Sequence, residues 1–564
     1  MAEERKKRVL LCSEFSLLST GFSVMNYETL KDLHESGKYE VAELASYIDD
    51  NYPKINDVPW KVYPVIPSPE KVDEKAKYNA DPTWQFGAGR LNDVLLDFQP
   101  DIVFSYRDFW HDEFITKTPY RNLFQYVWSA CVDSEPPAKH WIDRWSTVDL
   151  LTSYTDWGLG VLNTYGGSRL NIADTNTMPG IDTTQFCPAA DKEALRDKMG
   201  LSNDVNIILT VMRNQPRKLF PDIIRTFMHY IHDLYKEGRS EEADKTFLYL
   251  HTSHPDVGFD IPMEIQRYNA GHKILVTYIC DNPECKHSFP SFCQGEHTYC
   301  PKCHKLSAHM PNPGAGVTRD QLADIYRIAD LYIQYSVAGA LEIPIIEAKS
   351  AGIPVIVADY AAPYELNRMG GSAGEVKILG FKQEGVGNET GQLRAVPDND
   401  HLRKLIKKFF MHSPEKRAEM GVKARETAVK YHDAKLSSQK WMDIFDQMPM
   451  YPMDRWTQEP RIINIKHENI PYQLPDTAFV RWCVRSLLPA KHYCATYVYE
   501  KTLLKWLTMG YYVDAKGTIQ QCNKQSIVEI LNHEAQQYNH MELHRYNMLV
   551  TKPQQVDLTP HRIY

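Results

Sequence analysis

The sequence has no run of 18 apolar residues, no low-complexity tract and no excess of positive charge. A membrane-spanning helix needs about 20 apolar residues, so we expect no insertion into a membrane. The net charge is −8, from 64 basic against 72 acidic residues, which excludes a general attraction to nucleic acid or anionic lipid. The first residues lack a small-residue cleavage site. We therefore expect a cytoplasmic protein, in the host cytoplasm if the chain is viral.

The cysteines do not form the pattern of a disulfide framework. Their number, 11, is odd, and five of them fall between positions 280 and 303. Cys280 and Cys285 are followed after 14 residues by Cys300 and Cys303, a spacing that predicts a tetrahedral Zn²⁺ site. Four thiolates leave no position open for water, so this zinc would be structural. Three neighbours are less favoured ligands: His287, Cys293 and His304.

Short apolar runs alternate with helical patterns along most of the chain, as at 8–12, 207–211 and 354–357. This alternation is typical of parallel sheets with helical crossovers. The runs form two groups, separated by the turn-rich stretch 178–188. The pattern predicts an α/β fold with two doubly wound, Rossmann-like domains facing a cleft.

We predict four units from these patterns. A first Rossmann-like domain spans 1–185 and a second spans 186–446, interrupted by a zinc ribbon over 280–316. A C-terminal extension over 447–564 carries a local charge of +3 and interleaves cations with aromatics. Such side chains can stack on bases and meet phosphates, but they also suit the core of a small helical domain.

A glycine and two cations occupy positions suited to binding phosphate. Gly21 opens a helix after the predicted strand 8–12, where the backbone can approach a ligand and the helix N-terminus offers free N–H groups. Arg213 and Lys218 follow the predicted strand 207–211, and such cations stabilise a leaving diphosphate. An ordinary turn and a solvated basic loop are the alternatives.

A second motif lies between 336 and 357. Pro344 suits the first position of a helix and Gly352 the position after its end. Glu347 then falls in the first turn, where its carboxylate can accept hydrogen bonds from ribose hydroxyls. Compensation of the helix dipole, worth about 0.3 to 1 kcal/mol, is the alternative explanation for this acid.

Together these motifs resemble those of the retaining glycosyltransferases of the GT-B fold, in the large family four, across about 8–446. The matching positions are Gly21, 179–182, Arg213, Lys218, 325–330 and 344–357. The resemblance implies transfer of a hexosyl or pentosyl group, with retention, from a nucleotide sugar, UDP-sugar first, to an acceptor hydroxyl. It also implies that Arg213 and Lys218 act on the diphosphate without a catalytic metal, and that Glu347 binds ribose. The first domain, 1–185, would then face the acceptor, and the second, 186–446, would bind the nucleotide sugar.

Two positions depart from the family pattern. Gly339 stands where the family places a first, sugar-binding glutamate, so either Glu342 replaces it or the sugar is an unusual one. Asp133 stands near the position where many relatives have a histidine. We assign Asp133 to the catalytic set, as an acceptor or sugar contact.

The acceptor hypothesis comes from the two units outside the Rossmann-like domains, the zinc ribbon and the C-terminal extension. A zinc ribbon and a cationic, aromatic extension suit an enzyme acting on DNA, and phage enzymes that glycosylate hydroxymethylated bases have the GT-B fold. Hydroxymethylated cytosine in phage DNA is therefore the first acceptor hypothesis, with polysaccharide, protein and small molecules as alternatives. Gly339 also leaves open a degenerate core that only binds nucleic acid or protein. The sequence carries no signal for the oligomeric state.

Overall fold

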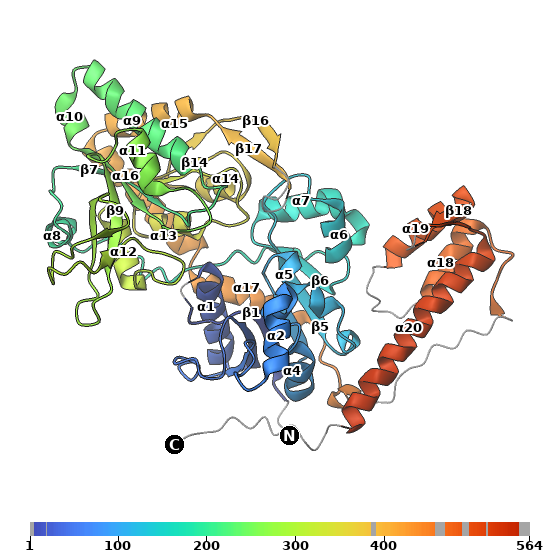
Figure 1. Ribbon diagram of the computed structural model, residues 1–564. Helices are drawn as coiled ribbons and strands as arrows, with labels where there is room; N and C mark the ends of the chain where they lie inside the picture. The colour runs from blue at the N-terminus through green and yellow to red at the C-terminus, as the bar shows by residue number, and fades with distance from the viewer. Residues whose placement is uncertain are drawn as a thin grey trace.

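The computed structural model describes residues 5–18, 20–384, 391–456, 469–487, 496–514 and 517–551. Two sheets with helices around them make up most of this part of the chain (Figure 1). Both are built mainly from parallel strands, so the α/β fold predicted from the alternating apolar runs is confirmed.

The first sheet has the strand order β3-β2-β1-β4-β5-β6, all parallel. Its strands are β1 (Lys7–Glu14), β2 (Tyr39–Ser46), β3 (Lys61–Pro64), β4 (Ile102–Ser105), β5 (Gln125–Ala130) and β6 (Leu150–Ser153). The accompanying helices are α1 (Gly21–Glu35), α2 (Val72–Ala80), α3 (Pro82–Gln85), α4 (Leu91–Phe98), α5 (Phe109–Thr116), α6 (Lys139–Trp145) and α7 (Asp156–Gly166).

The second sheet has the order β11-β12-β9-β8-β7-β13-β14-β15, with β10 also paired to β9. Its strands are β7 (Asn206–Val211), β8 (Thr246–His251), β9 (Ile274–Cys280), β10 (Ser288–Phe292), β11 (His297–Thr298), β12 (Ala308–His309), β13 (Leu331–Gln334), β14 (Val355–Ala358) and β15 (Ser372–Val376). Its helices are α8 (Lys192–Lys198), α9 (Phe220–Lys236), α10 (Ser240–Asp244), α11 (Ile261–Arg267), α12 (Arg319–Arg327), α13 (Ile343–Ser350), α14 (Ala361–Arg368), α15 (Asn399–Met411) and α16 (Pro414–Tyr431). A separate hairpin joins β16 (Ile378–Gln383) to β17 (Leu393–Pro397).

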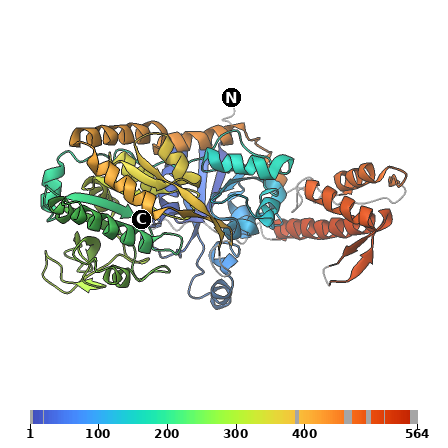
Figure 2. The same ribbon diagram turned by 90° about the horizontal axis from the view of Figure 1, so that it is seen from above.

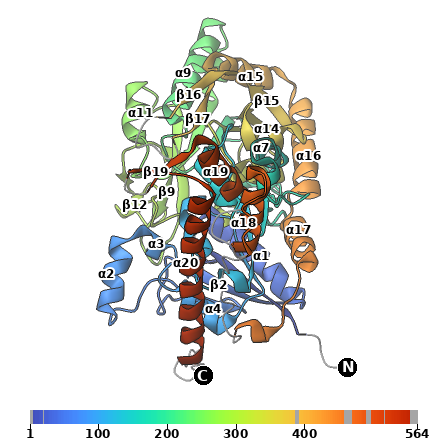
Figure 3. The same cartoon turned by 90° about the vertical axis from the view of Figure 1, so that its right-hand side faces the viewer.

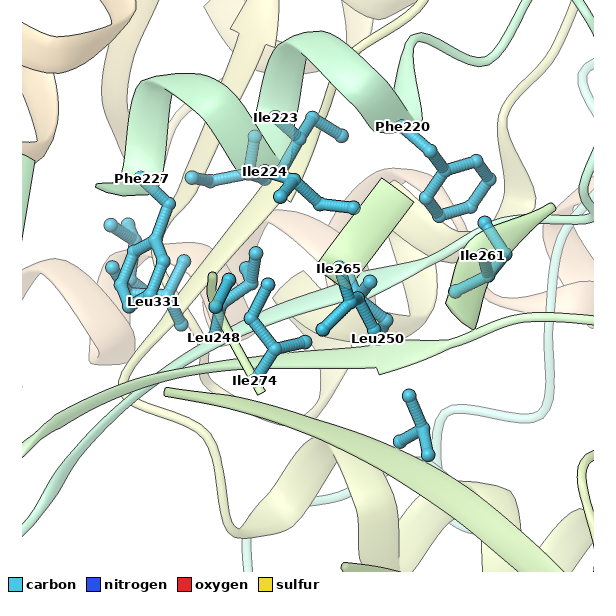
Figure 4. Close-up of a cluster of buried hydrophobic side chains, with 14 of the residues drawn as sticks. Phe220, Ile223, Ile224, Phe227, Leu248, Leu250, Ile261, Ile265, Ile274 and Leu331 are labelled. Carbon is cyan, nitrogen blue, oxygen red and sulfur yellow. The ribbon is translucent and has the colours of Figure 1, made fainter. Parts of the chain in front are cut away.

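Helix α9 shows how the second core forms. Apolar residues recur along it at helical spacing, so that Phe220, Ile224 and Phe227 share one buried face. This face packs with buried strand residues, among them Leu248 and Ile274 (Figure 4). The strands are apolar on both faces because helices cover both sides of a parallel sheet.

The last helix of the second segment, α17 (Ala434–Gln447), packs on the first sheet. Trp441 and Phe445 each lie 5.1 Å, between ring centroids, from Phe104 of β4. The chain therefore crosses between the two sheets twice, once near 178–188 and once just before α17. We retain 1–185 and 186–446 as proposed domain bounds, with α17 contributing to the first core.

The two crossing segments lie side by side. The N–H of Ile181 donates to the carbonyl of His432 at 2.9 Å, and the N–H of Ala434 donates to Ile181, also at 2.9 Å. A Cβ at Gly180 would lie 2.6 Å from the backbone of Asp433, so only glycine fits this approach.

His432, buried at this crossing, is expected to make folding sensitive to acid. Burial lowers the pKa of its imidazole to about 3, helped by the charges of Lys349 and Lys440. Between pH 6.5 and 3 the unfolded chain binds a proton there that the folded chain does not, so stability falls as the pH falls. For one such group the loss is about 2 kcal/mol on going from pH 7 to pH 5.

Chemical denaturation of His432→Leu across this pH range checks the expectation. Neither ring nitrogen has a hydrogen-bond partner within the described ranges, so an apolar side chain leaves no partner unsatisfied. The variant should lose less stability toward acid than the native protein, whereas His272→Leu, at an exposed position, should not differ from it. Equal pH slopes in all three proteins would contradict the role of His432.

The described part of the extension is a small helical unit. It contains α18 (Asp476–Leu487), α19 (Thr496–Met509), α20 (Lys524–Thr551) and the hairpin β18 (Tyr511–Val513) with β19 (Ile519–Gln521). Figures 1 and 2 show it beyond the first sheet, on the side away from the second, and Figure 3 views it from that side. Within the predicted unit 447–564, residues 457–468, 488–495, 515–516 and 552–564 lie outside the described residues.

The aromatic side chains of this unit pack in its own core, which argues against their stacking on bases. Phe479 is fully buried, and Trp506 stacks on Tyr512 with 5.1 Å between ring centroids. Arg481 and Arg485 both lie 3.7 Å from the carboxylate of Glu500, which offsets part of their charge. No helix in the described ranges combines the length and apolar character needed to cross a bilayer.

Candidate functional site

The loops after β1 and β13 meet between the two sheets. Gly21 begins α1, capped by the side chain of Thr20, and a Cβ on Gly21 would lie 3.8 Å from the side chain of Ile343. Leu341 and Ile343, at the start of α13, pack against the core of the first sheet. The N-termini of α1 and α13 therefore lie close together, and a helix N-terminus favours an anion.

Lys218 and Glu342 form a buried ion pair at the carboxyl edge of the second sheet. Their side chains are 4% and 8% exposed, and the Nζ of Lys218 contacts Oε1 of Glu342. The amide of Gln334, the last residue of β13, donates to Oε2 of Glu342 at 2.9 Å. Lys218 is the cation predicted to bind the diphosphate, and Glu342 is the candidate to replace the missing glutamate. Glu342 thus positions Lys218.

Gly339 allows Glu342 to take this position. A Cβ at residue 339 would lie 2.5 Å from Oε1 of Glu342. The carboxylate therefore fills the space in which a longer side chain at 339 would begin. This geometry supports the hypothesis that Glu342 replaces the absent glutamate.

Arg213 follows β7 at the same edge and is partly free for a ligand. Its guanidinium binds the carboxylate of Asp256 through two hydrogen bonds of 3.0 and 3.1 Å. The Arg213 side chain is 56% exposed, whereas Asp256 is 1% exposed. Because Asp256 orients one side of the guanidinium, the remaining N–H groups can face an anion.

The sequence pattern predicts Glu347 in the first turn of a helix, and this prediction is wrong: Glu347 lies in α13 but beyond its first turn. The helix begins at Ile343, one residue before Pro344, so Glu347 is its fifth residue. Its carboxylate accepts from the hydroxyl of Tyr326 at 2.8 Å and from Arg319 at 3.3 Å. Dipole compensation therefore does not explain this acid. Burial raises the pKa of Glu347, and the charge of Arg319 opposes that rise.

Glu14 is a candidate that the sequence patterns did not single out. It ends β1, and the hydroxyl of Thr20 donates to its carboxylate. Burial raises its pKa, while Thr20 and the nearby charges of Arg107 and Arg213 oppose the rise. An acid that ends a buried strand just before a glycine loop is the signal that could have indicated it.

Asp133 is held by a partner from the hairpin of β16 and β17. Its carboxylate lies 2.7 Å from the guanidinium of Arg394, on β17, and Arg394 also pairs with Glu384. Close by, the N–H of Glu135 donates to the hydroxyl of Tyr360. The geometry therefore favours a role for Asp133 in joining the two halves rather than in the chemistry.

Asp133→Asn is accordingly expected to lower the free energy of unfolding by about 1.5 to 3 kcal/mol, the range for hydrogen bonds to charged groups. Nucleotide affinity should change little, because the carboxylate of Asp133 contacts Arg394 and Ser134 rather than Arg213 or Glu347. Denaturation and calorimetric titration measure the two effects. Native stability with lost transfer activity would instead support the catalytic assignment.

The four predicted zinc ligands come together in the structure. The sulfur atoms of Cys280, Cys285, Cys300 and Cys303 all lie within 4.8 Å of one another. Two sulfur pairs are 3.7 Å apart, and tetrahedral Zn–S bonds of about 2.3 Å place sulfurs about 3.8 Å apart. The cluster is therefore compatible with zinc. The three less favoured ligands are not part of this group.

Several solved structures with the same fold are glycosyltransferases. Sucrose-phosphate synthase from Thermosynechococcus elongatus is 15% identical and superposes with a TM-score of 0.56, covering 78% of this chain and 99% of that one. A glycosyltransferase from Rickettsia africae gives 14% and 0.53, covering 79% and 99%. HepE of Anabaena, in complex with UDP and glucose, gives 11% and 0.52, covering 78% and 99%.

These similarities show the GT-B fold, as the sequence motifs had predicted. No protein-family model and no curated protein matches the sequence.

Proposed function

We propose that the protein is a glycosyltransferase that takes a sugar from a nucleotide-sugar donor, UDP-sugar first, and transfers it to an acceptor hydroxyl. The observation that carries the proposal is the group at the carboxyl edge of the second sheet: Lys218 paired with Glu342, the exposed Arg213, and the buried Glu347. The fold neighbour solved with UDP and glucose supports this choice of donor.

Each residue of the group would have a separate role. Arg213 and Lys218, with the N-terminus of α13, would stabilise the negative charge that grows on the leaving diphosphate. Glu347 would accept hydrogen bonds from ribose hydroxyls, and Glu342 would contact the sugar while positioning Lys218. Gly21 would allow the first loop to approach the donor.

Retention at the anomeric carbon is part of the proposal and is supported by the motifs alone. The acceptor hydroxyl would attack from the face that the diphosphate leaves, with the leaving phosphate taking its proton. That route needs neither a covalent carboxylate nor a divalent metal, because the protein's own cations stabilise the diphosphate.

Hydroxymethylated DNA remains the first acceptor hypothesis, drawn from the zinc ribbon and the extension. The pairing of Arg481 and Arg485 with Glu500 weakens the argument from the extension. Glycans, proteins and small hydroxyl compounds are therefore tested equally. A binding module without activity is the remaining alternative.

A mass-spectrometric screen for sugar transfer distinguishes among these acceptor classes and the inactive binding module. The protein is incubated with UDP-, GDP- and ADP-sugars, each below saturation, and with each acceptor class, and Glu347→Ala serves as the variant with weakened donor binding. The proposal expects a mass increase of one sugar on one acceptor class with UDP-sugar, and a smaller yield in the variant. No transfer and no donor hydrolysis with any nucleotide sugar would overturn it.

A further inference from the structure

The zinc ribbon continues the second sheet at the edge that carries the donor-site residues. Leu275 of β9 pairs with β8 on one side and with β10 on the other, while Ile279 pairs with β10 and β12. Strand β12 therefore lies on the same side of β9 as β8, just past the carboxyl end of β8. Arg213 and Asp256 follow strands that end at this edge.

The exit of the ribbon contacts the loop that orients Arg213. Directly after β12, the carbonyl of Pro311 accepts a hydrogen bond from the N–H of His254 at 2.6 Å. Asp256, two residues further along that loop, holds the guanidinium of Arg213. The position of this cation thus depends on a loop that is fixed to the ribbon.

A second contact joins the ribbon to α12, the helix whose first residue pairs with Glu347. The carbonyl of Lys286, next to the ligand Cys285, accepts from the amide of Gln321 at 3.2 Å. Gln321 also forms the capping box with Thr318 that begins α12. The first residue of that helix, Arg319, lies 3.3 Å from the carboxylate of Glu347.

The ribbon has little apolar core of its own. Between 281 and 307 most residues are exposed or half-buried, and the buried ones lie close to β9 or to the cysteines. A segment of this kind is ordered mainly by its metal, because burial alone does not offset the entropy of fixing the chain.

We propose that zinc bound by the four cysteines orders the donor site, so that metal and nucleotide bind cooperatively. The metal fixes both the loop behind Arg213 and the start of α12 beside Glu347. This inference rests on the proposed function, since it assigns the nucleotide to those residues. Coupling of this kind is reciprocal: what zinc adds to nucleotide affinity, nucleotide adds to zinc affinity.

The test uses the zinc-loaded protein, in which the fold is intact. Zinc is distributed at equilibrium between the protein and a chromogenic chelator, with and without saturating UDP. We expect UDP to tighten zinc binding at least fivefold. In the reciprocal titration, protein stripped of zinc should bind UDP more weakly by the same factor.

Three variants sharpen the experiment. Cys285→Ser should lower zinc affinity, whereas Cys293→Ser, a ribbon cysteine outside the group of four, should keep native zinc content and coupling. Gln321→Glu still accepts the cap hydrogen bond from Thr318 but cannot donate to Lys286. It should retain zinc and show weaker coupling to UDP.

Zinc affinity that is the same with and without UDP would overturn the coupling. Zinc-free native protein, or native zinc affinity in Cys285→Ser, would overturn the metal site itself. A zinc-loaded protein that binds no UDP would overturn the proposed function and, with it, the coupling.

Discussion

Replacing Lys218 with alanine should cost the protein both stability and activity. Lys218 is the buried partner of Glu342, so its removal leaves a carboxylate without its counter-charge in the interior. Breaking such a pair typically destabilises a fold by about 3 to 5 kcal/mol. Loss of the cation from the diphosphate site should also raise the barrier by about 2.7 to 4 kcal/mol, or about 10² to 10³ in kcat.

The double variant Lys218→Met with Glu342→Gln separates these effects. It removes both charges and keeps similar volumes, so thermal denaturation should show recovery of most of the lost stability. Transfer should stay as slow as in Lys218→Ala, because the cation is still missing. Recovery of activity together with stability would contradict a direct role for Lys218.

Glu347→Ala should give the second large effect, a loss of about 1.5 to 3 kcal/mol in UDP affinity, which is about 10- to 150-fold. The carboxylate is buried and held by Tyr326 and Arg319, so it is already oriented for ribose. Competition with dUDP identifies the contact, because a ligand without the 2′-hydroxyl should lose less affinity in the variant.

Glu365→Ala is the matched control for this prediction. Glu365 is a half-buried carboxylate, and it accepts from the N–H groups of Asp156 and Trp157 at the start of α7. Its loss should affect stability and leave UDP affinity unchanged. Equal UDP affinity in the native protein and Glu347→Ala would exclude the ribose assignment.

The general architecture could be predicted because it depends on local patterns. Buried parallel strands such as 207–211 give unbroken apolar runs, and the glycine after α13 marks its end, with Gly352 at a φ of 77°. The four cysteines could also be identified as a metal site from their spacing, since one short turn brings Cys280 near Cys285 and another brings Cys300 near Cys303.

Other features depend on long-range contacts that no local pattern shows. Asp133 and Arg394 are 261 positions apart, so the ion pair that joins the two halves could not be seen. The helix with Glu347 starts one residue earlier than Pro344 suggests, at Ile343, whose side chain packs against the cores of both sheets. The sheet on which α17 packs was likewise decided by tertiary contacts of Trp441 and Phe445.

Calorimetric titration of the zinc-loaded protein with UDP tests the central claim most directly. One UDP per chain should bind, and the affinity should fall about 10-fold or more in Arg213→Ala and in Glu347→Ala, because each removes a charged hydrogen bond to the nucleotide. Asp133→Asn should titrate like the native protein. Absence of UDP binding, or the same affinity in all four proteins, would contradict a nucleotide-sugar site at the carboxyl edge of the second sheet.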